Sequence, residues 1–426
     1  MIDRYALSPL KDIWSLQRTY EIWLEIEIAV LEAMEELGQI PRATAAKVRK
    51  TVTVDQRRIA EIEKTIGHDL LAFIRSIEEQ AGKEGRYIHY GLTSSDVKDT
   101  ALSIQIRDSI AIILEKTKGL QEIFTKKALQ YKDQLIAGRT HGIHAEPTTL
   151  GLKFLLWREE IKRNIKRLEQ AEQVITIGIF SGPVGTYSLL DREVEEIVCR
   201  RLKLNQAPVT SQIIQRDRHS EVMAAITISG TTLEKIATEI RHLSRTEINE
   251  MEEPTPEGSS SMPHKRNPII SERICGLARV LRGNLQAALE NNILWHERDI
   301  SHSSVERIIF PDSLALLDYM LAKMIGLIEN LVVRPAQMRV NLEMTRGAIF
   351  SHLLLLKLVD SGMARHSAYR IIARASESAA ARQLPLIKVL QEEEEIATLL
   401  TGESISTAQL LDDIRQMSRR IIEEAT

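Results

Sequence analysis

A chain of 426 residues exceeds the size at which one hydrophobic core usually stops growing, so we expect two or three domains. With 43% hydrophobic and 27% charged residues it is typical of a soluble globular protein, and its net charge of −3 excludes a basic surface for nucleic acid. Two cysteines exclude a disulfide framework, and we expect neither a signal peptide nor a membrane-spanning segment, because no long apolar run occurs in the sequence. We therefore expect a cytoplasmic protein that binds no nucleic acid and no membrane.

The first predicted elements are helices with chemical stop signals. An apolar-striped segment from about Tyr20 ends at Gly38 and Pro41, a C-cap glycine followed by proline. Further along, the serines and the aspartate of LTSSD (92–96) are capping residues for a helix that begins near Val97. Glycine and proline are scarce, so the helices should be long and uninterrupted.

Helices in the middle of the chain carry apolar positions spaced alternately three and four residues apart. This repeat keeps one narrow stripe against neighbouring helices, as in bundles and coiled coils. The three stripes are Ile106, Ile110, Ile113, Thr117, Leu120 and Phe124; Val222, Ile226, Ser229, Leu233, Ile236, Ile240 and Leu243; and Leu314, Leu317, Leu321, Met324, Ile328 and Leu331. They predict rods that pack side by side.

The third stripe lies in a helix predicted over 312–331, which FPDS opens and Pro335 follows. One short stretch, 173–186, is β-like, and the chain is otherwise predicted to be all-α. We divide it into an N-terminal helical domain (1–93), a central long-helix bundle (94–341) and a C-terminal helical domain (342–426).

Irregular polar stretches interrupt the predicted helices. They are GRTHGIHAEPTTLG (138–151), GSSSMPHKRNP (258–268), WHERDISHSSVERIIFPD (295–312) and, more weakly, IGHDLLAF (66–73) with IHYGLTSSD (88–96). Most of the histidines lie in these stretches. Because histidine titrates near neutrality, their concentration there suggests proton transfer.

One alternative for the first stretch is a metal site, because His141, His144 and Glu146 have ligand chemistry. Gly142 and Pro147 interrupt the regular helical spacing that such a pair needs, and no second cluster has ligand spacing. A second alternative is that the two histidines cap or bridge helix ends. Taken alone, this structural reading is favoured over catalysis.

The other stretches also have structural alternatives. One Lys-Arg pair between prolines is too small for a nucleic-acid patch, and Arg298 and Arg307 are compatible with exchanging surface salt bridges. Together, however, the stretches share arginine, lysine and hydroxyl groups, which suit a carboxylate- or phosphate-bearing ligand. The residues alone therefore indicate an α-helical enzyme that acts on a polyanion by acid–base chemistry without a metal.

The stretch GSSSMPHKRNP resembles the signature loop of the fumarase/aspartase lyase superfamily and fits every fixed position of G-S-S-x-M-P-x-K-x-N-P. GRTHGIHAEPTTLGLK, HYGLTSSDVKDTAL, QRDRHSE and WHERDISHSSVERIIFPD further resemble the adenylosuccinate lyase family of the bacterial type. The resemblance covers essentially the whole chain, and several ordered motifs make it specific.

The resemblance implies a three-domain all-α fold and a homotetramer whose long helices form a twenty-helix core. It implies active sites built from loops of three subunits, and no cofactor. The implied reaction is β-elimination of fumarate from a small-molecule nucleotide, adenylosuccinate or succinylaminoimidazole carboxamide ribotide. A base removes a C–H proton beside a carboxylate, and an acid protonates the departing nitrogen.

Site residues follow from the same motifs. Ser259 is the expected base, on the glycine-serine half of the loop, which would close as a lid. Lys265 and Asn267, held between prolines, are expected to stabilise the carboxylate-centred charge. His141 is the expected general acid, with His68 in support. The expected substrate contacts, together with the orienting Glu272, are Arg4, Tyr5, Asp69, Thr93, Ser94, Gln212, Ser260, Arg298, Ser303 and Arg307.

One position departs from the family. Many relatives have arginine where this chain has Gly67, so phosphate binding should rest more on Arg4 and Arg307. Two other functions compete with this interpretation. Argininosuccinate lyase or fumarase would share the serine loop but not WHERDISHSS or HYGLTSSD, and a non-catalytic scaffold would have lost residues that this chain keeps.

Overall fold

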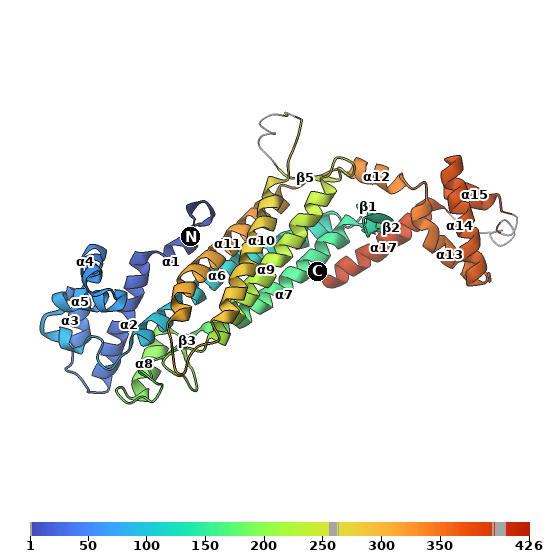
Figure 1. Cartoon of the computed structure of the whole chain (residues 1–426). Coiled ribbons are helices and arrows are strands. Elements are labelled where there is room, and N and C mark those ends of the chain that lie inside the picture. The colour runs from blue at the N-terminus through green and yellow to red at the C-terminus, as the bar shows by residue number, and fades with distance from the viewer. Residues whose placement is uncertain (1, 255–261, 263, 394–395, 397–405) are drawn as a thin grey trace. The chain divides into compact units, whose positions relative to one another are not determined.

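The computed structural model describes residues 2–254, 262, 264–393, 396 and 406–426 (Figure 1). The chain is mostly helical, as its sequence predicts. None of the helices in these ranges combines the length and low polarity needed to cross a bilayer.

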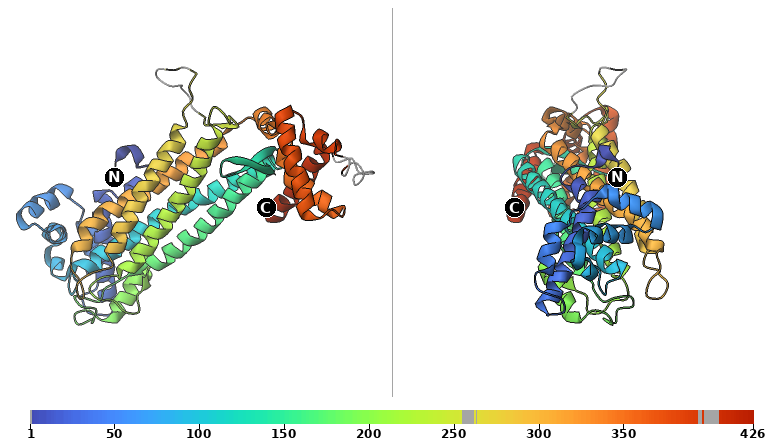
Figure 2. Two further views of the ribbon diagram at one scale, coloured as in Figure 1. Left: turned by 45° about the vertical axis from the view of Figure 1, so that its right-hand side comes forward. Right: turned by 90° about the vertical axis from the view of Figure 1, so that its left-hand side faces the viewer.

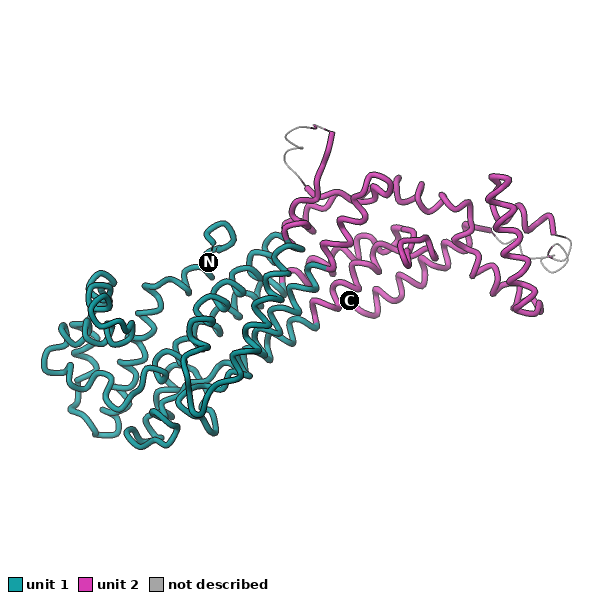
Figure 3. The backbone as a smooth tube through the Cα atoms, viewed as in Figure 1, with its two compact units in different colours: residues 1–118, 163–234, 274–323 teal, residues 119–162, 235–273, 324–426 magenta. Residues whose placement is uncertain are grey.

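The chain divides into two compact units (Figure 3). Unit 1 comprises Met1–Lys118, Arg163–Glu234 and Ile274–Lys323, and unit 2 comprises Gly119–Lys162, Lys235–Arg273 and Met324–Thr426. Each boundary falls inside a long helix, because these helices contribute residues to both units. The three-domain division at residues 93 and 341 stays a prediction.

Unit 1 contains a cluster of mostly short helices, which α8 joins from further along the chain. The cluster comprises η1 (Asp3–Tyr5), α1 (Leu10–Ile13), the longer α2 (Leu16–Glu36), α3 (Thr44–Thr51), α4 (Gln56–Ile66), α5 (Asp69–Ala81), η2 (Gly82–Tyr87) and α8 (Arg192–Leu202). The predicted end of α2 is confirmed, because Gly38 follows it with a φ of +71°. Tyr20, Trp23 and Phe73 pack together in the buried core.

Long helices form the rest of unit 1 and continue into unit 2. They are α6 (Ser94–Gln130), α7 (Leu150–Ile175), α9 (Arg216–Leu243), α10 (Ile269–Glu290) and α11 (Ser301–Glu329). Within unit 1, α6, α9, α10 and α11 run side by side (Figure 2). Lys116 of α6 pairs with buried Asp318 of α11 at 2.6 Å, and Thr227 of α9 donates to the carbonyl of Leu281 on α10. Every residue of the three predicted stripes is buried.

Two helix boundaries differ from the prediction. The helix α6 begins at Ser94 rather than near Val97, because the Thr93 N–H donates to Asp96 at 2.7 Å and the cap lies one turn earlier. The helix α11 begins at Ser301 and continues through Pro311, so FPDS does not open it. Proline removes one hydrogen bond from a helix interior, but here Phe310 and Leu314 are fully buried on either side and packing holds the helix.

Unit 2 contains a hairpin that the sequence did not predict. Strands β1 (Leu135–Thr140) and β2 (Ile143–Thr149) pair antiparallel, with Leu135 opposite Thr149 and Thr140 opposite Ile143. His141 and Gly142 form the two-residue turn, and both have positive φ, +55° and +79°, as tight hairpins require. His141 and His144 therefore do not cap helix ends, and that alternative is wrong.

The remaining elements are short. They are β3 (Ile177–Gly178), β4 (Asn205–Gln206), β5 (Met251–Glu252), β6 (Val332–Val333), α12 (Pro335–Glu343), η3 (Ala348–Phe350), α13 (Ser351–Asp360), α14 (Arg365–Arg382), α15 (Leu386–Gln391) and α17 (Thr407–Ala425). Strand β3 pairs parallel with β4, and β5 pairs antiparallel with β6. The β-like stretch of 173–186 is thus two paired residues after α7. Helices α12, α13, α14, α15 and α17 pack around a second core that includes Leu135 of the hairpin.

Candidate active site

A cavity of about 440 Å³ lies in unit 1 among α2, α5, α6 and the start of α11. Among its polar lining side chains, the five that we consider for anion binding are Asp69, Lys98, Arg298, Ser303 and Arg307. Four of them are predicted site residues: Asp69 comes from one polar stretch of the sequence, and the other three come from the stretch 295–312. Aromatic side chains, including those of Tyr20 and Trp23, form the apolar part of the wall.

Asp69 organises the cations of this cavity. Its carboxylate pairs with Lys98 and with Arg307, each at 2.5 Å. Burial raises the pKa of Asp69, but the two cations outweigh burial and lower the pKa to about 2. Burial lowers the pKa of Lys98, and the nearby Arg307 and Arg298 lower it further. Asp69 raises this pKa, but it offsets the decrease only in part. The cavity therefore holds a carboxylate that stays ionised and cations crowded beside it.

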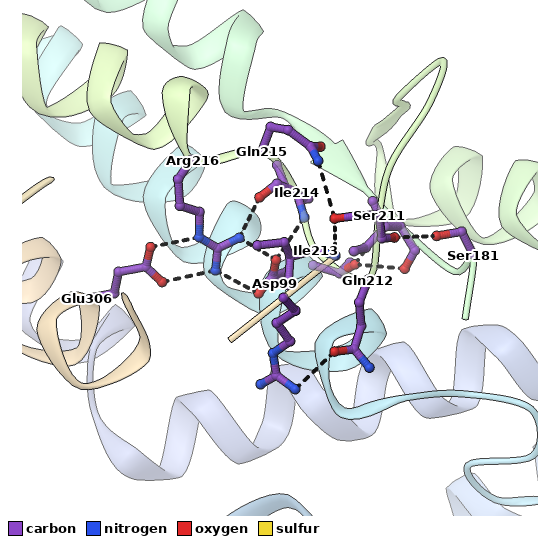
Figure 4. Close-up of polar contacts among 12 residues, drawn as sticks. Asp99, Ser181, Ser211, Gln212, Ile213, Ile214, Gln215, Arg216 and Glu306 are labelled. Atoms are coloured by element: carbon purple, nitrogen blue, oxygen red, sulfur yellow. Dashed lines mark hydrogen bonds and ion pairs between the residues drawn. The ribbon is translucent and has the colours of Figure 1, made fainter. Parts of the chain in front are cut away.

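A buried ion network forms part of the cavity wall (Figure 4). Arg216 donates to both carboxylate oxygens of Asp99 (2.6 and 3.1 Å) and to both of Glu306 (2.8 and 3.1 Å). Asp99 also accepts the N–H of Ile214, and Arg216 donates to the Ile214 carbonyl. The network therefore fixes the loop that carries Gln212 against the starts of α6 and α11.

One guanidinium cannot neutralise two buried carboxylates. Burial raises the pKa of Asp99, but Arg216 outweighs it and the result is lowered. For Glu306 burial dominates and raises the pKa to about 7. Neighbouring His302 is kept neutral, because burial and then Arg216 lower its pKa to about 4. The network thus contains one carboxyl group, that of Glu306, which loses its proton as the pH rises through about 7.

Gln212 faces the cavity cations from this loop. Its side-chain oxygen accepts from Arg298 at 3.3 Å. Thr93 and Ser94 lie at the start of α6, where the Thr93 hydroxyl donates to Asp96 at 3.1 Å. Burial raises the pKa of Asp96 to about 6 despite these bonds from Thr93.

His68 is the N-cap of α5, and its Nδ1 accepts the N–H of Leu71 at 3.3 Å. The other ring nitrogen, Nε2, is therefore the one that remains for a substrate. Gly67 is the C-cap of α4 with a φ of +66°. This left-handed conformation gives a physical reason for glycine at position 67.

Arg4 and Tyr5 lie in η1. Arg4 is exposed, while Tyr5 packs edge-to-face on Tyr319 with ring centres 5.1 Å apart. Both residues belong to unit 1, but neither lines the cavity.

His141 lies in unit 2, exposed at the tip of the hairpin. Arg139 anchors the hairpin through two bonds to Glu250, at 2.8 and 3.0 Å, and Glu250 is fully buried. Asn341 donates a further bond to Glu250. His141, with its left-handed φ, therefore follows a strand whose end is held in place by Arg139.

The described end of the signature loop also belongs to unit 2. Lys265 is exposed, Asn267 is partly buried, and Glu272 lies exposed in the first turn of α10. Buried Glu253 accepts the N–H groups of Ile270 and Ser271 at the start of that helix. Ser259 and Ser260 lie outside the described residues.

Comparisons with known proteins agree with these motifs. Residues 4–283 match the Lyase family, and residues 347–425 match the family described as adenylosuccinate lyase C-terminus. Adenylosuccinate lyase of Bacillus subtilis is 45% identical over 409 residues, 95% of each chain. The Aquifex aeolicus enzyme of the same name is 46% identical and covers 96% of this chain and 95% of its own. The chain belongs to the adenylosuccinate lyase family.

Solved structures confirm the lyase fold. A fumarate lyase from Mesorhizobium sp. BNC1 has a TM-score of 0.89 at 26% identity and covers 100% of this chain and 99% of its own. A 3-carboxy-cis,cis-muconate lactonizing enzyme from Pseudomonas putida has a TM-score of 0.89 at 27% identity, covering 99% and 97%. The identity to named adenylosuccinate lyases is much higher, which separates the family from other lyases of this fold.

Within this family member the structure gathers some predicted residues in one cavity, and other predicted residues belong to the second unit. Asp69, Arg298, Ser303 and Arg307 share the unit 1 cavity, whereas His141, Lys265, Asn267 and Glu272 belong to unit 2. No group of three His, Cys, Asp or Glu side chains in the described part of the chain is arranged to hold a metal.

Sequence reasoning missed Lys98 and the network of Asp99, Arg216 and Glu306. All four lie inside motifs that carry the resemblance, so the motifs were the available signal. Their pairing joins three separate segments, and spacing along the chain does not reveal it.

Proposed function

We propose that this adenylosuccinate lyase family member cleaves adenylosuccinate to AMP and fumarate, and succinylaminoimidazole carboxamide ribotide to aminoimidazole carboxamide ribotide and fumarate. The observation that carries this is the identity of about 45% to named adenylosuccinate lyases over 95% of each chain. We place the reaction in the cytoplasm, with which two free cysteines are compatible.

In the proposed reaction Ser259 takes the proton from the succinyl carbon next to the carboxylate. The electron pair expels the nitrogen of the nucleotide, and His141, supported by His68, protonates that nitrogen. Lys265 and Asn267 hold the charge that develops on the carboxylate. Glu272 orients its neighbours at the start of α10.

The nucleotide phosphate is proposed to bind Arg4, Tyr5, Ser303 and Arg307, with Arg298 beside them. Arg307 has a side chain 60% exposed and uses one terminal nitrogen for Asp69, so its other N–H groups remain available. An ionised Asp69 would repel a phosphate, so its contribution to binding is to orient Arg307 and Lys98. Thr93, Ser94, Gln212 and Ser260 are assigned to the succinyl carboxylates and adjacent polar groups.

We further propose a homotetramer with active sites shared between subunits. Apolar side chains remain exposed on the long helices of unit 1, including Ile228 (40%), Val280 (46%) and Ile308 (62%). Side chains of this kind on a helical bundle fit burial against other copies of the chain. Residues from both units would then meet across subunit boundaries.

A substrate panel tests the proposed function. Purified protein is given adenylosuccinate, argininosuccinate and malate in turn, and the change in ultraviolet absorbance is followed with and without a chelator. We expect turnover of adenylosuccinate alone, at the same rate in both conditions. Turnover of only argininosuccinate or malate would refute the assignment, and loss of activity with chelator would refute the metal-free mechanism.

A further inference from the structure

Unit 2 contains a second cavity, of about 770 Å³, which shares no residue with the unit 1 cavity. It lies among the start of β1, α12, the turn before η3, α15 and the first turns of α17. Its apolar wall includes Leu135, Leu342, Phe350, Ile387 and Leu411. A volume of this size is typical of pockets that hold an organic molecule.

The charges at this cavity do not cancel. Two carboxylates line it, and each has a cation of its own: Asp133 pairs with Arg419 at 2.5 Å, and Glu343 pairs with Arg339 at 3.0 Å. Arg346 and Arg415 also line the cavity. Among the described residues neither guanidinium has a carboxylate partner within ion-pair distance. Among the residues that line the cavity, three arginines therefore face two carboxylates, which leaves an excess of positive charge beside an apolar wall.

The turn that carries Arg346 is in an unusual conformation. Arg346 has a φ of +48° and Gly347 a φ of +91°. The Arg346 carbonyl accepts the N–H of Leu386 at 2.9 Å, which ties this turn to the start of α15. A non-glycine residue with positive φ is uncommon and often marks a functional position.

The cavity also adjoins the hairpin that presents His141. Gln134 and Leu135 line the cavity, and Leu135 is the first residue of β1, which ends one residue before His141. A molecule bound against Leu135 would restrain the base of this strand. The cavity is thereby connected through β1 to the turn that carries a proposed catalytic side chain.

We propose that this cavity binds an organic oxyanion, a phosphate or carboxylate group carried on an apolar body, and that binding changes turnover through the hairpin. Arg346 and Arg415 hold the anionic group, because guanidinium groups bind such oxygens in pairs. The apolar wall holds the body of the ligand. Inorganic phosphate lacks that body and binds more weakly.

Binding is tested by calorimetry on the whole protein with 1-naphthyl phosphate, an aromatic phosphate, as the probe. The double variant Arg346→Gln/Arg415→Gln removes the cations, and Ala408→Trp fills the cavity from α17 without a change in charge. We expect calorimetry to show that each of the two variants binds the probe about tenfold or more weakly than the parent does at one class of binding site. The matched control, Arg365→Gln/Arg370→Gln, removes two exposed arginines outside the cavity and should bind as the parent does.

Thermal unfolding first confirms that each variant is folded. Equal binding by the parent, the cation variant and the filled variant would overturn the proposal, as would a probe that binds no more tightly than inorganic phosphate. The binding measurement does not depend on the proposed lyase activity.

The second part of the proposal, that binding changes turnover, rests on the proposed function. It is tested by measuring initial rates at saturating adenylosuccinate with and without the probe. A probe at the active site would raise KM and be outcompeted, whereas binding at this cavity should change kcat by about twofold or more. That change should be absent from the cation variant. An unchanged kcat despite measured binding, or an equal change in the variant, would overturn the coupling. Failure of every substrate would instead refute the proposed function.

Discussion

Glu306→Gln tests the shared-charge network of α11. Glu306 and Asp99 compete for the one guanidinium of Arg216, and burial raises the pKa of Glu306 from 4.5 to about 7. Glutamine keeps the shape of the side chain but cannot ionise. The substitution therefore removes one titration and leaves the surrounding packing in place.

The sign follows from proton linkage. The pKa of Glu306 is higher in the folded than in the unfolded chain, so the folded protein binds the proton more tightly. The resulting stabilisation is fully present below about pH 4.5 and is lost as the pH rises through about 7. Between pH 5 and pH 8 the loss is about 2.5 kcal/mol in the free energy of unfolding. Glu306→Gln should escape this loss and gain that amount relative to the parent.

Urea unfolding at fixed protein concentration, from pH 5 to pH 8, measures the difference between variant and parent. Exposed Glu297→Gln removes the same formal charge at the surface and should show no such trend. The infrared band of protonated buried carboxyl groups gives a direct reading: the part of the band that disappears through about pH 7 in the parent should be missing from Glu306→Gln, whereas the part from Asp96, with a pKa of about 6, should remain in both. A variant-to-parent difference that is the same at pH 5 and pH 8 would refute the shared-charge reasoning.

Four further outcomes are expected. Ser259→Ala should lower kcat by about a thousandfold or more with unchanged gel-filtration behaviour, and retained turnover would remove the serine from the base role. Mixed subunits of inactive His141→Ala and Ser259→Ala chains should regain part of the activity, and no rescue after verified exchange would contradict shared sites. Asp69→Asn should raise the KM for adenylosuccinate about tenfold, because the cations of the cavity lose their anchor, whereas an unchanged KM would exclude an orienting role. Gly185→Ala should lower the melting temperature by several degrees more than Gly182→Ala, because both have a φ near +79° but only at Gly185 would a Cβ meet a carbonyl oxygen, at 2.1 Å; equal losses would rule out this contact.

The helical framework was predictable because it depends on local periodicity. Each predicted stripe, such as the one from Val222 to Leu243, is buried in the structure. Glycine at the end of a helix acts through its own φ, so the end of α2 at Gly38 was also readable. The hairpin around His141 was not, because its turn carries histidine at the first position, where asparagine or glycine is the usual signal. The predicted start of α11 after Pro311 was wrong because packing of the buried helix outweighed the local tendency of proline to end a helix.

The sequence by itself determined the family, the long helices and the set of residues with acid–base and anion-binding chemistry, because motifs and periodicity are properties of neighbouring residues. Only the tertiary structure decided that Asp69 joins Lys98 and Arg307, and that Arg216 is shared by Asp99 and Glu306. These pairs join segments up to 238 residues apart. Their distances and pKa values depend on burial and on which charges meet, and both arise only when the helices pack.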